Sequence, residues 1–114
     1  MCIMKDPKNK YNSLILAIGG ITVTNRKDPY LKKITQTITD LASVEYFSIT
    51  DSKWERYNAG LEIARHEASA SYLGDYIYVI GGHTVSQPKK FINTIERCHK
   101  TVRSSHFERI NIKQ

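Results

Sequence analysis

Two runs of apolar and aromatic residues, each ending in a pair of glycines, dominate the hydrophobic pattern of this chain. The first is SLILAIGGIT at residues 13–22, and the second is YIYVIGGHT at residues 76–84. Short continuous runs rich in Ile, Val and Tyr favour strands whose two faces are both covered by neighbouring sheets. The pattern therefore predicts interior strands at LILAI, residues 14–18, and at YIYVI, residues 76–80.

Weaker alternating patterns predict the other strands. The segment EASASYL is followed by Gly74-Asp75, a two-residue turn that predicts a β-hairpin with YIYVI. Its small residues, 68–71, suit a strand that lies where neighbouring backbones crowd together. Two further strand pairs are predicted, at 43–49 with 54–60 and at 94–100 with 107–112.

Residues 21–42, ITVTNRKDPYLKKITQTITDLA, interrupt this pattern. Asp28-Pro29 indicates a turn, whereas the periodicity of LKKITQTI fits either a short helix or an added strand. We therefore treat the segment as an inserted loop.

The glycine pairs Gly19-Gly20 and Gly81-Gly82 occupy equivalent places at the ends of the two apolar runs. Glycine accepts positive φ and allows another backbone to approach closely, so a pair suits the end of a strand in a tightly packed sheet. A phosphate-binding loop is disfavoured, because neither pair belongs to a known phosphate-binding glycine motif and no helix pattern follows.

A second feature follows each glycine pair after a polar loop. The segments SVEYFSIT and TIERCHKT align through Glu45 and Glu96, and an aromatic residue follows each of them, Trp54 in the first copy and Phe107 in the second. An ordered set of features that occurs twice is an internal repeat, and repeats decide the fold when they are present.

This repeat resembles the kelch repeat, a four-stranded propeller blade of about 50 residues. The family pattern is an apolar strand ending in Gly-Gly, a variable loop, a Val-Glu-x-Tyr-like strand and a Trp seven residues after the aromatic. The second copy departs from it, with Cys98 at the Tyr position and Phe107 nine residues later. The residues that carry the resemblance, all predicted to be structural, are Gly19, Gly20, Glu45, Phe47 and Trp54 in the first copy and Gly81, Gly82, Glu96 and Phe107 in the second.

The resemblance implies an all-β fold of antiparallel four-stranded blades, forming an incomplete kelch-type β-propeller of about two blades. We expect an N-terminal segment at 1–12, a first repeat at 13–61 and a second repeat at 62–114. The first repeat is expected to lack a clear innermost strand, because MCIMKDPKNK offers few apolar residues. Trp54 is expected to pack between blades rather than to stack on a ligand.

Most intracellular kelch proteins are recognition modules, so the resemblance implies binding of a protein partner. In an up-and-down blade, the loop after the second strand shares a face with the connection to the next blade. Residues that bind partners are often found in loops held by a rigid scaffold. Basic residues there would suit an acidic partner. The candidate binding residues are Arg65, His66, His83, Thr84, Lys89 and Lys90.

Composition adds few constraints. The 114 residues are 40% hydrophobic and carry a net charge of +6, which fits one globular domain with a basic surface. No apolar run approaches the roughly 20 residues of a membrane span, and the N-terminus lacks the apolar region of a secretory signal. Cys2 and Cys98 form no disulfide or zinc spacing. We expect two reduced thiols in a cytoplasmic protein.

No catalytic or metal motif is recognised, so we predict no catalytic residue, no metal, no cofactor and no enzymatic activity for the chain alone. Some kelch proteins are enzymes, among them copper radical oxidases and sialic acid mutarotases, and others are substrate receptors of ubiquitin ligases. A fragment of such an enzyme and a basic nucleic-acid-binding surface remain alternatives. A ubiquitin-ligase adaptor is a further role known in the family.

Two blades cannot bury both of their faces. Repeat arrays usually need at least three units, and closed propellers have typically 4 to 8 blades. We therefore expect that the chain either belongs to a longer product or associates with copies of itself or with another chain.

Overall fold

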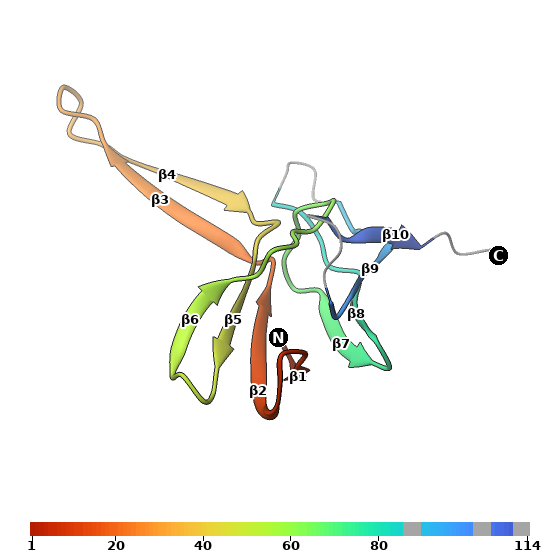
Figure 1. The fold of residues 1–114 in the computed structure, drawn as a ribbon. Helices are drawn as coiled ribbons and strands as arrows, with labels where there is room; N and C mark the ends of the chain where they lie inside the picture. Colours follow the sequence, from red (N-terminus) through yellow and green to blue (C-terminus); the bar gives the residue numbers. More distant parts are fainter. Residues whose placement is uncertain (86–89, 102–105, 111–114) are drawn as a thin grey trace.

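The computed structural model describes residues 1–85, 90–101 and 106–110, and the regular structure within them is all β-strand. Figure 1 shows two sheets side by side and a long hairpin that projects from one of them. None of the described residues forms a helix long and apolar enough to span a membrane. The strands are β1 (Cys2–Asp6), β2 (Asn9–Ile18), β3 (Ile21–Lys27), β4 (Ile34–Asp40), β5 (Val44–Ser48), β6 (Lys53–Arg56), β7 (Ser69–Leu73), β8 (Tyr76–Ile80), β9 (Ile95–His99) and β10 (Glu108–Ile110).

Each main sheet has four antiparallel strands. The first sheet has the order β1-β2-β5-β6, and the second sheet has the order β7-β8-β9-β10. The predicted hairpin in the second sheet is confirmed, since Leu73 pairs with Tyr76 across the Gly74-Asp75 turn. The all-β prediction with antiparallel four-stranded units is confirmed as well.

The N-terminal residues form a strand that the sequence pattern did not reveal. β1 pairs with β2, with Cys2 opposite Leu16 and Met4 opposite Leu14. Only two apolar side chains, Cys2 and Met4, point into the core, which is enough for an edge strand whose backbone pairs on one side. The expectation that the first repeat lacks an innermost strand is therefore wrong, whereas the boundary between the repeats stays a prediction.

Residues 21–42 form a two-stranded hairpin rather than an irregular loop or a helix. β3 and β4 pair in continuous register from Ile21 with Asp40 to Lys27 with Ile34. The side chain of Asp28 closes the end of the hairpin by accepting hydrogen bonds from the backbone N–H groups of Tyr30 and Leu31. Alternating Thr, Ile and Val favour this extended ribbon.

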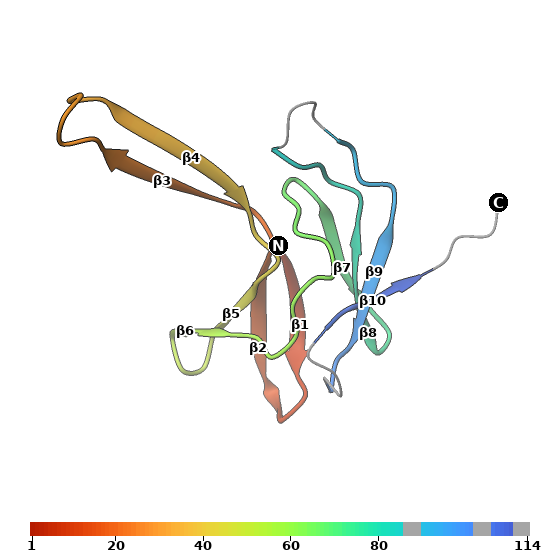
Figure 2. The same ribbon diagram turned by 90° about the horizontal axis from the view of Figure 1, so that it is seen from above.

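The hydrophobic core lies between the two sheets, and β1 contacts β7 where their edges meet (Figure 2). Fully buried apolar side chains such as Leu16 and Ile77 each contribute roughly 1.5–3 kcal/mol by leaving water. The segment that connects the sheets supplies Ala59 and Leu61 to the same core. The core residues are Cys2, Met4, Leu14, Leu16, Val44, Ala59, Leu61, Ile77, Val79, Cys98 and Phe107.

The outer face of each sheet is open to solvent, which corrects the expectation that β2 and β8 are covered on both faces. In the first sheet Ile3 and Trp54 are 64% and 53% exposed, and in the second sheet Ile80 is 47% exposed. A strand interior to its sheet is thus buried only on the side that meets the other sheet.

Candidate functional site at the loop face

Three connections meet at one end of the two sheets, which we call the loop face. They are the β2–β5 connection, which contains the hairpin, the β6–β7 connection between the sheets, and the β8–β9 connection. The Gly20 N–H donates to the Arg65 carbonyl at 2.8 Å, and the His66 N–H donates to the His83 carbonyl at 3.1 Å. The middle connection is therefore tied by its backbone to both of the others.

The glycine pairs make this close approach possible. Gly19 and Gly82 have φ angles of +66° and +88°, which favour glycine. A Cβ at Gly19 would lie 2.5 Å from the Arg65 carbonyl oxygen, and one at Gly82 would lie 2.7 Å from that of His66. Each pair thus ends a strand and also admits the β6–β7 connection against the sheet.

Arg65 does not belong to an exposed binding surface. Its side chain is fully buried and its Nη2 lies 2.5 Å from Oε2 of Glu96, which is also fully buried. Its guanidinium also donates to the backbone carbonyls of Gly81 and Thr94. The prediction that Arg65 contacts a partner is therefore wrong, because all three guanidinium nitrogens donate hydrogen bonds within the protein.

His66 and His83 are brought together, as the predicted placement of the loops requires. Their ring centroids are 4.0 Å apart, with an angle of 67° between the ring planes. The Nδ1 of His66 lies 2.6 Å from Oδ1 of Asp40, and the Nε2 of His83 lies 2.5 Å from Oε2 of Glu67. We call Asp40, His66, Glu67 and His83 the histidine cluster.

Sequence reasoning missed the two carboxylates of the histidine cluster. Asp40 lies at the end of β4 and also accepts a hydrogen bond from the Val85 N–H at 2.9 Å. Burial raises the pKa of Asp40, but the hydrogen bonds from Val85 and His66 outweigh it, so this pKa lies below its usual value. Asp40 is therefore an anion at neutral pH that joins the hairpin to both histidine-bearing connections.

The remaining predicted binding residues lie on the β8–β9 connection. The Thr84 N–H donates to the Lys90 carbonyl at 2.9 Å, and the Lys90 side chain is exposed. Lys89 lies outside the described residues. A contact between Lys90 and a partner remains a prediction.

Residues at aligned positions of the two repeats differ in burial. Cys98 and Phe107 face the first sheet and are buried, whereas Phe47 and Trp54, at the aligned positions, lie on the open face. Trp54 contacts Phe47, with ring centroids 5.4 Å apart. Trp54 is therefore not packed between the two described sheets, and its aligned counterpart Phe107 is.

The glutamate of the repeat pattern also differs in burial between the two copies. Glu96 is buried and receives hydrogen bonds from the N–H groups of Glu62 and Ile63 at 2.6 and 3.2 Å. Glu45 is exposed on β5. The N–H groups that bond to Glu96 come from the β6–β7 connection, which precedes the second copy. Among the described residues no equivalent connection precedes the first copy.

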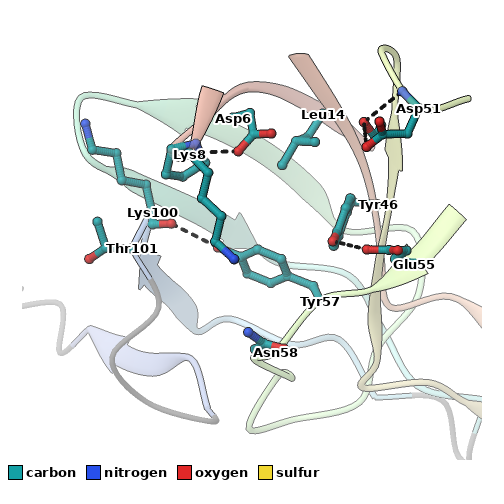
Figure 3. Close-up of a pocket in the computed structure, with 12 residues that line it drawn as sticks. Asp6, Lys8, Leu14, Tyr46, Asp51, Glu55, Tyr57, Asn58, Lys100 and Thr101 are labelled. Atoms are coloured by element: carbon teal, nitrogen blue, oxygen red, sulfur yellow. Dashed lines mark hydrogen bonds between the residues drawn. The ribbon is translucent and has the colours of Figure 1, made fainter. Parts of the chain in front are cut away.

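A pocket of about 500 Å³ lies at the opposite end of the sheets, beside the β1–β2 and β5–β6 turns (Figure 3). Tyr46 donates to Glu55 at 2.5 Å across its wall, and this hydrogen bond, together with burial, raises the pKa of Tyr46 to about 12. Acidic and basic side chains, Asp51 and Lys8 among them, both line the opening. Of the predicted binding residues that the structure describes, none lines this pocket.

Comparison with known proteins agrees with the fold. Residues 64–97 match the Kelch motif, a span that begins just before Arg65 and runs through β7 and β8 into β9. No curated protein matches the chain. The motif and the four-stranded antiparallel sheets support assignment of the chain to the kelch-repeat family, and we refer to the two sheets below as blades.

Proposed function

We propose that this chain is a protein-interaction module of kelch type that binds a protein partner through its loop face. The observation that carries the proposal is the β3–β4 hairpin, which forms a sheet of its own and projects beyond the blades (Figure 1). An isolated two-stranded hairpin is at best marginally stable in water. A partner that covers it would supply the missing contacts.

The two sides of the hairpin differ in character. One side carries threonines on both strands, and the other carries apolar side chains, with Val23 opposite Ile38. A surface of branched apolar side chains rimmed by polar groups is typical of protein-binding sites. Four apolar residues lie on this side and are exposed by 45%, 47%, 70% and 43%: Ile21, Val23, Ile34 and Ile38.

Charge suggests which partner fits. The distal half of the hairpin carries more basic than acidic residues, and all of its basic side chains are exposed. A partner with an apolar patch and an acidic rim would match both properties and associate faster at low salt. The basic residues are Arg26, Lys27, Lys32 and Lys33.

The test compares two similar changes, one in the hairpin and one beside the β1–β2 turn, at the end of the first sheet away from the loop face. Partners are isolated by affinity purification on the wild-type chain, and the Kd of one purified partner is then measured for Ile34→Glu and Tyr11→Glu. Ile34 and Tyr11 are 70% and 87% exposed, so neither change should unfold the protein. We expect only Ile34→Glu to weaken binding, by at least about tenfold; equal losses would contradict a role for the loop face.

A second proposal concerns the outer faces of the blades. When the two repeats are aligned, the open Phe47–Trp54 face of the first blade corresponds to the face of the second blade that packs in the core. The open face of the second blade at Ile80 corresponds to the face of the first blade that packs in the core. The two open faces are thus complementary in kind. We infer that they pack head to tail against further blades, supplied by a copy of this chain or by another chain.

Other roles have no specific support among the described residues. A ubiquitin-ligase adaptor and a fragment of a kelch-type enzyme would rest on the family alone, and nucleic-acid binding would rest on the net charge of +6. A cytoplasmic location also stays a prediction, and it would suit the two free thiols, Cys2 and Cys98.

A further inference from the structure

We propose that His66, Glu67 and His83 form a binding site for a divalent transition-metal ion, with Zn²⁺ as the ion that fits best. Each of the three residues offers one ligand atom, and these atoms all lie within 4.8 Å of one another. The site would lie where the β6–β7 connection meets the β8–β9 connection.

The backbone explains how neighbouring residues come to share one site. His66 and His83 form an antiparallel bridge, with hydrogen bonds of 3.1 and 3.0 Å in the two directions. In a regular strand His66 and Glu67 would point to opposite faces. Glu67 has a φ of +56°, an uncommon value for a residue other than glycine, which breaks this alternation and allows both side chains to reach His83.

Asp40 prepares His66 for metal binding. Its carboxylate oxygen lies 2.6 Å from His66 Nδ1, so the neutral imidazole carries its proton there and presents the lone pair of Nε2. A carboxylate on the far nitrogen of a histidine ligand fixes the ring and makes the ligand more basic. Asp40 is thus a positioning residue, and it is itself held by the Val85 N–H.

His83 supplies the independent observation. The ring is buried, yet its Nδ1 has no hydrogen-bond partner among the described residues. Buried polar atoms are normally satisfied, and an exception asks for an unseen ligand or ion. With Nε2 directed at the Glu67 carboxylate at 2.5 Å, the lone pair of Nδ1 is the one that an ion would take. The two ring nitrogens point in different directions, so the exposed Glu67 side chain would turn away from Nε2 to bind the same ion.

The ligand types and their exposure suit zinc. Two imidazoles and one carboxylate are a ligand set that Zn²⁺ accepts with a water in the fourth position. The Glu67 side chain is 74% exposed, whereas those of His66 and His83 are 14% and 10% exposed, so an ion could enter from the side of Glu67. A bound ion would join two connections of the loop face.

Titration calorimetry with ZnCl₂ on the full chain, with both cysteines replaced by alanine, tests the site. We expect binding of about one equivalent, and we expect Glu67→Gln to weaken it by more than tenfold while the control Glu62→Gln leaves it unchanged. Glu67 is exposed, so its substitution should leave the fold intact, and circular dichroism checks this. No binding by the parent chain, or equal affinity of both variants, would overturn the proposal.

Two further measurements separate a metal site from adventitious binding. Asp40→Asn should lower Zn²⁺ affinity by about 10- to 100-fold, as expected for loss of a carboxylate behind a histidine ligand. Co²⁺ bound in place of zinc should give the visible absorption of a tetrahedral site in the parent chain, and His83→Gln should abolish it, whereas His99→Gln should not. A spectrum that survives His83→Gln would contradict the assignment.

Discussion

Arg65 and Glu96 form a buried ion pair that fastens the segment between the blades to the second blade. Their Nη2 and Oε2 atoms are 2.5 Å apart, and neither side chain is exposed. Glu96 also receives the Glu62 N–H at 2.6 Å, and Arg65 donates to the Gly81 carbonyl at 2.9 Å. The pair therefore satisfies backbone groups of both connections that it touches.

Breaking this pair should destabilise the protein strongly. Arg65→Met leaves the Glu96 carboxylate buried without its cation, and we expect a loss of about 3–5 kcal/mol in the free energy of unfolding. Urea denaturation measures it. Replacing both residues, Arg65→Met with Glu96→Leu, should recover part of the loss, and a double variant less stable than the single one would show that the pair is not the cause.

The Gly81-Gly82 pair should be required for folding for two reasons, the positive φ angles and the lack of space for a side chain at Gly82. Gly82→Ala places a Cβ 2.7 Å from the His66 carbonyl oxygen, whereas Gly74→Ala meets no atom within 4 Å although both glycines have positive φ. We expect Gly74→Ala to cost about 1 kcal/mol and Gly82→Ala about 3 kcal/mol or more. Thermal melts compare the two. Equal shifts would mean that the close approach contributes nothing.

Head-to-tail association should be visible through Trp54, the only tryptophan of the chain. Its side chain is 53% exposed, so its fluorescence should shift to shorter wavelength as rising protein concentration covers the face. We expect Trp54→Lys and Ile80→Lys each to be monomeric by themselves in light scattering, because every copy of a variant then lacks one of the two faces that the contact needs. An equimolar mixture of the two variants should form heterodimers, because each retains one of the two complementary faces.

An interface that pairs the same face of two copies predicts a different result. The mixture would then give no more association than the variants alone, and only one of the two substitutions would have an effect. A parent chain that stays monomeric at tens of micromolar, with unshifted fluorescence, would contradict association altogether.

Cys98 should be protected from alkylation in the folded protein. Burial raises the pKa of its thiol to about 11, and the thiolate is the reactive form. At pH 8 we expect labelling by iodoacetamide at least about 100-fold slower than in urea, measured by mass spectrometry on a Cys2→Ala background. The unfolded thiol ionises first as the pH rises, so the free energy of unfolding should fall from about pH 9 toward pH 11. A rate unchanged by unfolding would contradict this environment.

Much of the fold is determined by local sequence. The apolar runs before Gly19 and Gly81 predict β2 and β8, and Gly74-Asp75 predicts the β7–β8 hairpin, because strand propensity and turn chemistry act over a few residues. The internal repeat then predicts two similar blades, and both are present.

The candidate site could be predicted only in part. His83 and His66 were placed on one face by the order of strands, which is a topological argument. The same argument placed Arg65 there, and it could not show that the side chain turns inward to Glu96. The direction in which the Arg65 side chain points depends on the buried carboxylate of Glu96, which lies on a strand 31 residues further along the chain.

Tertiary structure alone decided which faces are covered and which carboxylates join the histidines. β1 is a strand because Cys2 and Met4 enter a core that the second blade completes, and Trp54 is exposed because no blade packs on its side among the described residues. Asp40, the last residue of the hairpin, contacts His66, which lies 26 residues further along the chain. Local patterns determine strands and turns by short-range sterics, whereas burial and pairing depend on surfaces that meet only after the chain has folded.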